Sequence, residues 1–465
     1  MTHSRNYRTL KRLIVPALAG GALAALAFAP TFGAEPVQAN SPAQSISAPK
    51  GDAPKADMPK TDIPKTDVPR PDDVKTGEIN EPTPYKEANP STFTGTSVIS
   101  ESKTFEHQRF DNTTSDHNSF IGKNKASITI NSSVFDKTGN TTNDDNSNFR
   151  GQNAVVLGIE GSQTSIKDSN ITSNSIGSNA VFATGEGSVV NVENTNIHTK
   201  GDSSRGLDAT YKGTVNGKNL TITTEGAHSA TLATDRGEGT ITAEAAKLTT
   251  SGTGSPVIYS TGNITANNVN GVANKSEIGV VEGKNSITLT NSNVTGYHDN
   301  GFMLYQSFSG DAESAIARLK AENNTLTTHG TGAFIYVNNT TAEADLTGNT
   351  ILMPNTTTLV KAAADSRWGK DGENGGHLTL RASNQELSGN IVADSISTIA
   401  LDMANGSSLV GAINTDNTAK EVTVKLSKDS TWTLTGDSYV KSLTNEDTTG
   451  SNIHLNGYKL VVADK

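Results

Sequence analysis

The stretch SITLTNSNVTG, residues 286–296, decides the fold, because versions of it recur along the chain. Its apolar residues are Ile287, Leu289 and Val294, so their spacing is two and then five. The alternating pair predicts a short strand, and the Asn-Ser-Asn that follows predicts a tight turn, since asparagine tolerates left-handed backbone angles. The same spacing recurs at Val190/Val192/Ile197, Ile241/Ala243/Leu248, Leu319/Ala321/Leu326 and Ala344/Leu346/Ile351.

A second apolar phrase keeps step with the first and completes an internal repeat of about 25 residues. It reads NAVFAT at 179–184, SATLAT at 229–234, SPVIY at 255–259, GFMLY at 301–305 and GAFIY at 332–336. A unit this small cannot bury its own apolar face, so it must stack on its neighbours at about 4.8 Å per coil. Short strands without intervening helices predict an all-β chain that forms a parallel β-helix.

Residues 1–39 have the features of a secretory signal peptide. Four basic residues between Arg5 and Arg12 precede an apolar stretch at 14–28 that is rich in Ala and Leu. That stretch is short and Gly-rich for a membrane span, which predicts removal of the segment and no stable membrane insertion of the mature chain. Cleavage after Ala39 fits the small-residue rule at such sites. We therefore expect an exported protein.

The composition excludes several classes of partner and chemistry. The formal net charge is −10 at pH 7, which argues against nucleic acid and anionic lipid as partners. The chain has no cysteine, so it has no disulfide, thiol nucleophile or thiolate metal site. The histidines are scattered without a chelating spacing, and we expect no metal and no cofactor.

Residues 40–90 are expected to form a disordered linker rich in Pro, Lys and Asp. A five-residue repeat runs through it as APKGD, APKAD, MPKTD and IPKTD at 48–67. Proline at every fifth position prevents both helices and sheet ladders, so the segment is predicted to be an extended spacer. A ligand for a proline-reading domain and a cell-wall-penetrating segment are the functional alternatives.

The repeat pattern is weaker at 91–150, where we expect an N-terminal cap and the first irregular coils. The end of a β-helix exposes unpaired strand edges and core side chains, so a cap is required. Four aromatic residues suit that role, namely Phe93, Phe105, Phe110 and Phe120. The parallel β-helix proper is expected at 151–465.

Three tyrosines are the first candidate for a binding site. Tyr259, Tyr305 and Tyr336 occupy the same place in their apolar phrases. If the residue before each tyrosine points inward, alternation turns the tyrosines outward into an aromatic stripe along one face. Such a stripe can stack on sugar rings or pack on a partner protein, or it can simply stabilise the outer face.

A segment without strand alternation is the second candidate. Residues 365–376, DSRWGKDGENGG, are predicted to form a loop that projects from a turn. Loops on rigid scaffolds often carry function, and Arg367 and Trp368 beside a lysine are suited to contact a ligand. The alternative is a tolerated surface insertion.

The sequence pattern of the coils changes from about Leu387 onward. The sequence there reads LSGNIVAD at 387–394, GSSLVGAI at 406–413 and TWTLTGDS at 431–438. This succession resembles the C-terminal passenger region of bacterial autotransporters of the pertactin and AIDA-like type, and with the looser coils upstream the resemblance covers most of 150–465. It implies a right-handed parallel β-helix, exported and then displayed on, or released from, a Gram-negative cell. Family members continue into a translocating β-barrel, whereas this sequence stops at Lys465, so a periplasmic location is the alternative.

Parallel β-helices also host polysaccharide lyases and glycoside hydrolases. Such hydrolases need carboxylates that converge on one face, and the fragments at 144–145 and 414–416 come in the wrong order and lie far apart. We therefore predict no catalytic residue and expect a non-catalytic, adhesin-like or structural surface protein whose partners are host or bacterial surface glycans or proteins. A carbohydrate-active enzyme and a degenerate passenger without activity are the alternatives. Acidic and basic residues meeting on neighbouring coils would favour the enzyme.

Overall fold

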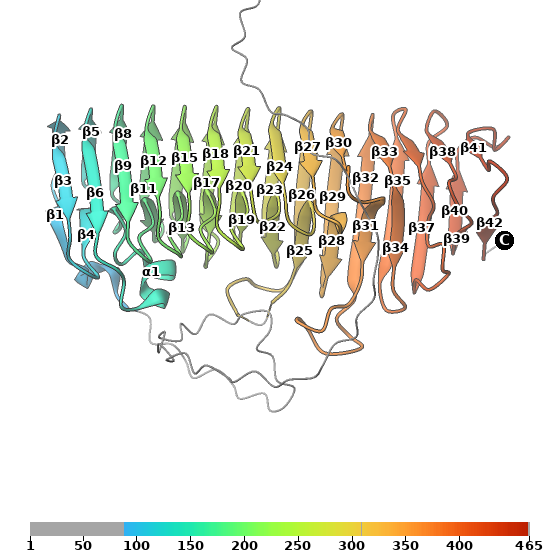
Figure 1. Cartoon of the computed structure of the whole chain (residues 1–465), viewed down its shortest axis with the longest axis horizontal. Coiled ribbons are helices and arrows are strands. Elements are labelled where there is room, and N and C mark those ends of the chain that lie inside the picture. The colour runs from blue at the N-terminus through green and yellow to red at the C-terminus, as the bar shows by residue number, and fades with distance from the viewer. Residues whose placement is uncertain (1–87, 308, 464–465) are drawn as a thin grey trace, which may run out of the picture. The chain divides into compact units, whose positions relative to one another are not determined.

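The computed structural model describes residues 88–307 and 309–463, all within one compact unit. They form an all-β parallel β-solenoid in which the chain passes in turn through three long sheets, A, B and C (Figure 1). One passage through the three sheets makes one coil. The fold class expected from the repeat is thus confirmed. The expected signal peptide at 1–39 and the linker as far as residue 87 lie outside the described residues.

Each strand inside a sheet pairs with its equivalents in the preceding and following coils, the first and last strand of each sheet pair on one side only, and all of these pairs are parallel. Sheet A contains β1 (Gly95–Ile99), β4 (Asn118–Gly122), β7 (Val156–Gly158), β10 (Val181–Thr184), β13 (Leu207–Thr210), β16 (Leu232–Thr234), β19 (Ile258–Ser260), β22 (Gly279–Glu282), β25 (Phe302–Tyr305), β28 (Ala333–Asn338), β31 (Thr358–Ala362) and β34 (Asn390–Ala393). Sheet B contains β2 (Lys103–Glu106), β5 (Ser127–Asn131), β8 (Gln163–Lys167), β11 (Val189–Glu193), β14 (Thr214–Lys218), β17 (Thr240–Glu244), β20 (Asn263–Asn267), β23 (Ser286–Thr290), β26 (Ile316–Glu322), β29 (Thr340–Thr347), β32 (Gly376–Ser383), β35 (Thr398–Ala404), β37 (Glu421–Leu426) and β40 (Ser442–Asn445). Sheet C contains β3 (Arg109–Asn112), β6 (Val134–Thr138), β9 (Asn170–Asn174), β12 (Asn196–Thr199), β15 (Thr221–Thr224), β18 (Lys247–Thr250), β21 (Asn270–Ala273), β24 (Asn293–Gly296), β27 (Thr325–Thr328) and β30 (Thr350–Leu352).

The repeated stretch at 286–296 forms β23, a turn and β24. Ile287, Leu289 and Val294 have no exposed surface, because alternation sends them into the core while their polar neighbours face out. The turn residue Asn291 has a φ of 51°, the left-handed conformation that its short amide side chain tolerates. The two-then-five spacing therefore marks two strands on adjacent sheets and the corner between them.

Residues 91–150 contain complete coils as well as a helix. The strands of β1 to β6 already pair in register with the next coils, so regular stacking begins at Gly95. Phe105, Phe110, Phe120 and Phe135 fill the interior of this end, with the rings of Phe110 and Phe135 stacked at 4.8 Å. The short helices are η1 (Pro90–Thr92) and α1 (Asp144–Arg150).

Two columns of small residues line the corner that leads from sheet C to sheet A. Gly201, Gly226 and Gly252 stack so closely that a Cβ atom on Gly226 would lie 1.9 Å from the carbonyl oxygen of Gly201. Ser204 and Ser229 are fully buried beside them, and the Ser229 hydroxyl accepts a 2.9 Å hydrogen bond from the backbone N–H of Ser204. Glycine is required here for space, and the serines satisfy backbone donors that the corner leaves unpaired.

In the last coils sheet B continues to β40, and two further sheets begin where the sequence pattern changes. The four-stranded sheet contains β33 (Glu386–Ser388), β36 (Ser408–Val410), β38 (Thr431–Thr433) and β41 (Ile453–His454), and a two-stranded sheet contains β39 (Ser438–Val440) and β42 (Leu460–Val462). Trp432 is fully buried in this region, and its Nε1 donates a 3.0 Å hydrogen bond to the carbonyl oxygen of Gly411.

Three long connections flank sheet A. Helix α1 lies between β6 and β7, residues 306–315 lie between β25 and β26, and residues 363–375 lie between β31 and β32. All three extend from the same side of the stacked coils (Figure 1). The outer face of sheet A therefore receives residues from distant parts of the chain.

Candidate functional site

The three predicted tyrosines lie on the outer face of sheet A. The residues before them, Ile258, Leu304 and Ile335, are fully buried, as alternation predicts. The three tyrosines face outward but are not freely exposed: Tyr336 is only 5% exposed and the other two tyrosines are half-buried. Strand register also places Tyr259 and Tyr336 in one row and Tyr305 in the next. Alternation predicts the side that a residue faces but not what covers it, and a binding role for the tyrosines stays a prediction.

Glu282, at the end of β22, joins two of the tyrosines. Its Oε2 accepts hydrogen bonds from the hydroxyls of Tyr259 at 2.8 Å and Tyr305 at 3.0 Å. Its Oε1 accepts from the hydroxyls of Ser307 and Ser309. The Glu282 side chain is buried, so four hydroxyl donors replace the water it has lost. Burial, and then the charge of Glu282, raise the pKa of Tyr259 and Tyr305 well above the usual range.

The predicted loop at 365–376 folds back against sheet A. The rings of Trp368 and Tyr305 lie 5.5 Å apart, and the Tyr336 hydroxyl lies 3.5 Å from Asp365. Arg367 pairs with the same Asp365, with Nη2 and Oδ2 2.8 Å apart. Burial, and then the Asp365 charge, raise the pKa of Tyr336. All five site residues predicted from sequence therefore lie in one region, although Arg367 is tied to a carboxylate.

A group of buried charges continues this region toward the N-terminal coils. Asp208 in β13, Asp235 after β16 and Arg205 before β13 are exposed by 0%, 5% and 8%. Arg205 Nη2 donates a 3.2 Å hydrogen bond to Asp235 Oδ1, and Arg205 Nε lies 3.0 Å from Asp235 Oδ2, so the two side chains form a close ion pair. A buried ion pair of this kind costs desolvation energy, which makes it unusual in a solenoid built from Ser, Thr and Asn.

Helix α1 and the connection after β25 cover these charges. Arg236 lies 3.6 Å above the Phe149 ring of α1, and its Nε donates a 2.8 Å hydrogen bond to Asp311. Thr210 donates to the carbonyl oxygen of Phe149 at 2.9 Å. We call the assembly the covered cluster, and it comprises Arg205, Asp208, Asp235, Arg236, Tyr259, Glu282, Tyr305 and Asp311.

Sequence reasoning missed the acidic and basic members of the covered cluster. The available signal was an exception to the repeat: Asp208 stands inside the phrase LDAT, where equivalent phrases carry an apolar or tyrosine side chain. Asp235 and Arg236 directly follow the phrase SATLAT. A charge inside a repeating apolar phrase indicates either a defect or a site, and only the three-dimensional contacts distinguish the two.

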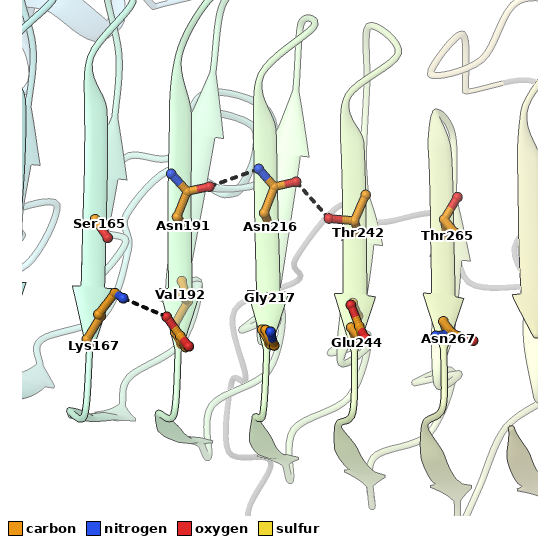
Figure 2. A pocket seen from close by; sticks show the side chains of 13 residues that line it. Ser165, Lys167, Asn191, Val192, Asn216, Gly217, Thr242, Glu244, Thr265 and Asn267 are labelled. Carbon is orange, nitrogen blue, oxygen red and sulfur yellow. Dashed lines mark hydrogen bonds and ion pairs between the residues drawn. The ribbon is translucent and has the colours of Figure 1, made fainter. Parts of the chain in front are cut away.

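An open groove of about 470 Å³ lies on the outer face of sheet B and crosses five strands, β8, β11, β14, β17 and β20 (Figure 2). We call it the sheet-B groove, and it is lined by Ser165, Lys167, Asn191, Val192, Glu193, Asn216, Gly217, Lys218, Thr242, Ala243, Glu244, Thr265 and Asn267. One row of outward side chains is small and polar, and the next row is mostly charged. No motif in the sequence indicated this surface.

Side-chain hydrogen bonds run along the small polar row of the sheet-B groove. Asn216 Nδ2 donates to Asn191 Oδ1 at 2.9 Å, and Thr242 Oγ1 donates to Asn216 Oδ1 at 2.7 Å (Figure 2). In the charged row, Lys167 and Glu193 form an ion pair at 2.8 Å, which raises the pKa of Lys167. The same polar chemistry thus recurs at each coil.

The described residues offer neither a metal centre nor a membrane-crossing helix. Residues 88–307 and 309–463 contain no group of three or more histidine or acidic side chains placed to hold a metal ion. Over the same ranges, no helix has the length and apolar character needed to cross a bilayer. A comparison with known protein families gives no matching family model, and no curated protein sequence matches the chain.

Proposed function

We propose that this protein is an exported, non-catalytic β-solenoid of the passenger type that holds an extended glycan chain in the sheet-B groove. Its place of action in this proposal is the cell surface or the surrounding medium. The observation that carries the proposal is an open, polar groove that crosses five coils of a rigid scaffold. The C-terminal coils that resemble autotransporter passengers support the export half of the proposal.

The chemistry of the sheet-B groove suits a linear sugar polymer. Sugar hydroxyls donate and accept hydrogen bonds, as do the side chains of Asn191, Asn216 and Thr242 on the groove floor. A linear polymer meets the same groups again at each coil, about 4.8 Å further on, so weak contacts add along its length. Lysine and glutamate alternate in the charged row, which gives no preference for a strongly charged polymer.

Replacing Asn216 by leucine tests the groove directly. The substitution removes the hydrogen bonds to Asn191 and Thr242, and it puts an apolar side chain at the centre of the floor. We expect affinity for a glycan identified on an array of linear bacterial and host polysaccharides to fall by about tenfold or more, which corresponds to about 1.4 kcal/mol. Isothermal titration with the purified chain measures the change.

The matched control is Asn196→Leu on sheet C. Asn196 is also an outward-facing strand asparagine, and it bonds to Asn170 of the preceding coil at 3.2 Å, but it lies outside the sheet-B groove. This variant should bind as the wild type does. Equal losses in the two variants, or a wild-type chain that binds no polysaccharide on the array, would contradict the proposed groove function.

Fractionation of the producing bacterium tests the export half of the proposal. An antibody to the solenoid should detect a band shortened by removal of a segment close to residues 1–39. Protease added to intact cells should remove that band, or the band should be found in the medium. A band protected from protease and released only with the periplasm would contradict surface display and support the periplasmic alternative.

Glycan cleavage is a second candidate, and the covered cluster favours it. Thr234 pairs with Ser260, and Ser260 pairs with Val281, so the backbones of the residues that follow, Asp235 and Glu282, lie two coils apart, or about 9.6 Å at the usual strand spacing. Inverting glycosidases hold their two carboxyl groups roughly 6.5–9.5 Å apart. Here Tyr259 bonds to Glu282 between them, so a substrate must displace that contact. Release of reducing ends that is lost in Glu282→Gln but kept in Asn216→Leu would identify this activity.

A further inference from the structure

Asp208 is buried at a position where an ionised carboxylate needs a compensating partner. It has no exposed surface, and neither of its carboxyl oxygens has a hydrogen-bond partner among the described residues. An ionised carboxyl group in such a place loses its hydration, and the Arg205 charge and the Ala209 backbone N–H, which both lower its pKa, do not make up for that loss. The usual solutions are a counter-charge, a metal ion or a proton.

The one nearby counter-charge is already engaged. Arg205 directs Nε and Nη2 to the carboxylate of Asp235, and its Nη1 to the side chain of Asn148 at 2.5 Å and the carbonyl of Ser203 at 3.2 Å. Asp208 therefore lies beside the carboxylate of Asp235, which already pairs with Arg205. Both oxygens of Asp208 and Oδ2 of Asp235 are buried without a hydrogen-bond partner among the described residues, and the charge of Asp235 raises the pKa of Asp208. Asp208 and Asp235 therefore have one positive charge between them, that of Arg205, and one negative charge stays uncompensated if both acids are ionised.

We propose that Asp208 and Asp235 form a proton-binding site, in which Asp208 carries one proton and donates it to Asp235 at neutral pH. The proton removes the surplus charge and supplies the donor that the Asp208–Asp235 contact lacks. Aspartic-protease dyads show the same principle, since two carboxyl groups in contact cannot both ionise easily. Desolvation, and then the charge of Asp235, raise the pKa of Asp208 well above its usual range, which agrees with the geometry.

The charged and titratable groups around this pair come from every element that packs on it. Arg205 precedes β13, Asp235 and Arg236 follow β16, Tyr211 follows β13, Tyr259 lies on β19, Asp145 lies on α1, and Asp311 lies in the connection after β25. Arg150 of α1 also acts on Tyr211, and Glu282 of β22 acts on Tyr259. The three arginines are thus matched by three acids beyond the pair, and the surplus negative charge lies on the pair itself. Tyr259 donates to Glu282 and is not free to donate to Asp208.

Loss of this proton has a defined structural consequence. Because the pKa of Asp208 is raised in the folded chain, the proton's contribution to stability is present at low pH and is lost as pH rises through the folded-state pKa. Above that pH, Asp208 and Asp235 repel each other and compete for Arg205. Arg205 also holds Asn148 of α1, so α1 should loosen from sheet A as the pH rises through the folded-state pKa of Asp208.

Hydrogen exchange of the full chain, with Asp208→Asn as the test variant, measures this effect. Asparagine keeps the shape of the protonated acid and donates an N–H to Asp235 without a titrating proton. We expect amides of 144–150 and 205–211 to open more easily as pH rises in the wild type, by up to about tenfold per pH unit beyond the intrinsic exchange rate. In Asp208→Asn, the corrected opening should not depend on pH. The control Asp168→Asn, at an exposed position, should follow the wild type.

A second variant, Asp235→Asn, and a measurement with calcium and a chelator complete the test. In Asp235→Asn, Arg205 is free to pair with Asp208, so opening should be faster at all pH values and lose its pH dependence. The proposal is overturned if Asp208→Asn keeps the wild-type pH dependence or does not fold at pH 6. It is also overturned if calcium protects the wild type at pH 9 and a chelator removes that protection, because a metal ion then occupies the place of the proton.

Discussion

A Gly252→Ala substitution is expected to destabilise the central coils more than the same substitution at any other glycine that the structure describes. A Cβ atom at this position would lie 1.7 Å from the carbonyl oxygen of Gly226, and the next contacts are also backbone atoms. Backbone cannot rotate away as a side chain can, so the corner must open and the paired strands on both sides must shift. We expect a loss of at least about 3 kcal/mol in the free energy of unfolding, measured by chemical denaturation.

Gly436→Ala is the control for that substitution. An added Cβ there would lie 3.2 Å from the Cβ of Ala412 and would meet no backbone atom within that distance. We expect the denaturation midpoint of this variant to stay close to that of the wild type. Equal midpoints for Gly252→Ala and Gly436→Ala would show that the glycine column does not set the spacing of the coils.

The second large effect is expected for Glu282→Ala in the covered cluster. The substitution removes the acceptor of four hydroxyl groups, and it leaves a void beneath Tyr259 and Tyr305. Unpaired buried hydroxyls and lost packing together should cost about 3–4 kcal/mol. Chemical denaturation, combined with proteolysis of the connection after β25, measures the loss and locates it.

Tyr259→Phe separates the loss of one hydrogen bond from the loss of the shared acceptor. The ring stays in place and only the 2.8 Å hydrogen bond to Glu282 is removed, so we expect a cost of about 1 kcal/mol. If Glu282→Ala costs no more than Tyr259→Phe, the four hydroxyls find other partners, and Glu282 does not organise the cluster.

The repeat phrases predicted the fold because the residues of each phrase determine its own strands and turn locally. Ile287, Leu289 and Val294 specify inward positions on two strands, and Asn291 specifies the corner between them. These strands and turns need contacts only with the neighbouring coils. The change in the repeat pattern near Leu387 was visible in the sequence for the same reason, because β33 begins a new sheet at that point.

The covered cluster was only partly predictable, because its contacts join residues far apart in the chain. Alternation placed Tyr259, Tyr305 and Tyr336 on the outer face, but the cover comes from α1 and from the connections after β25 and β31. A projecting loop and a loop that folds back have the same composition, so Arg367 and Trp368 gave no sign of their contacts with Asp365 and Tyr305. The sheet-B groove escaped notice because polar outward residues are ordinary on any solvated strand.

Contacts across the covered cluster change how this solenoid should melt. In a simple solenoid each coil touches only the next, so unfolding can start anywhere and stop at any coil. Arg205 bonds to Asn148 across 57 positions and Arg236 bonds to Asp311 across 75 positions, so these contacts bridge coils that do not touch. Coils between α1 and Asp311 are therefore tied into one cooperative block, while coils beyond it remain free to fray from the ends.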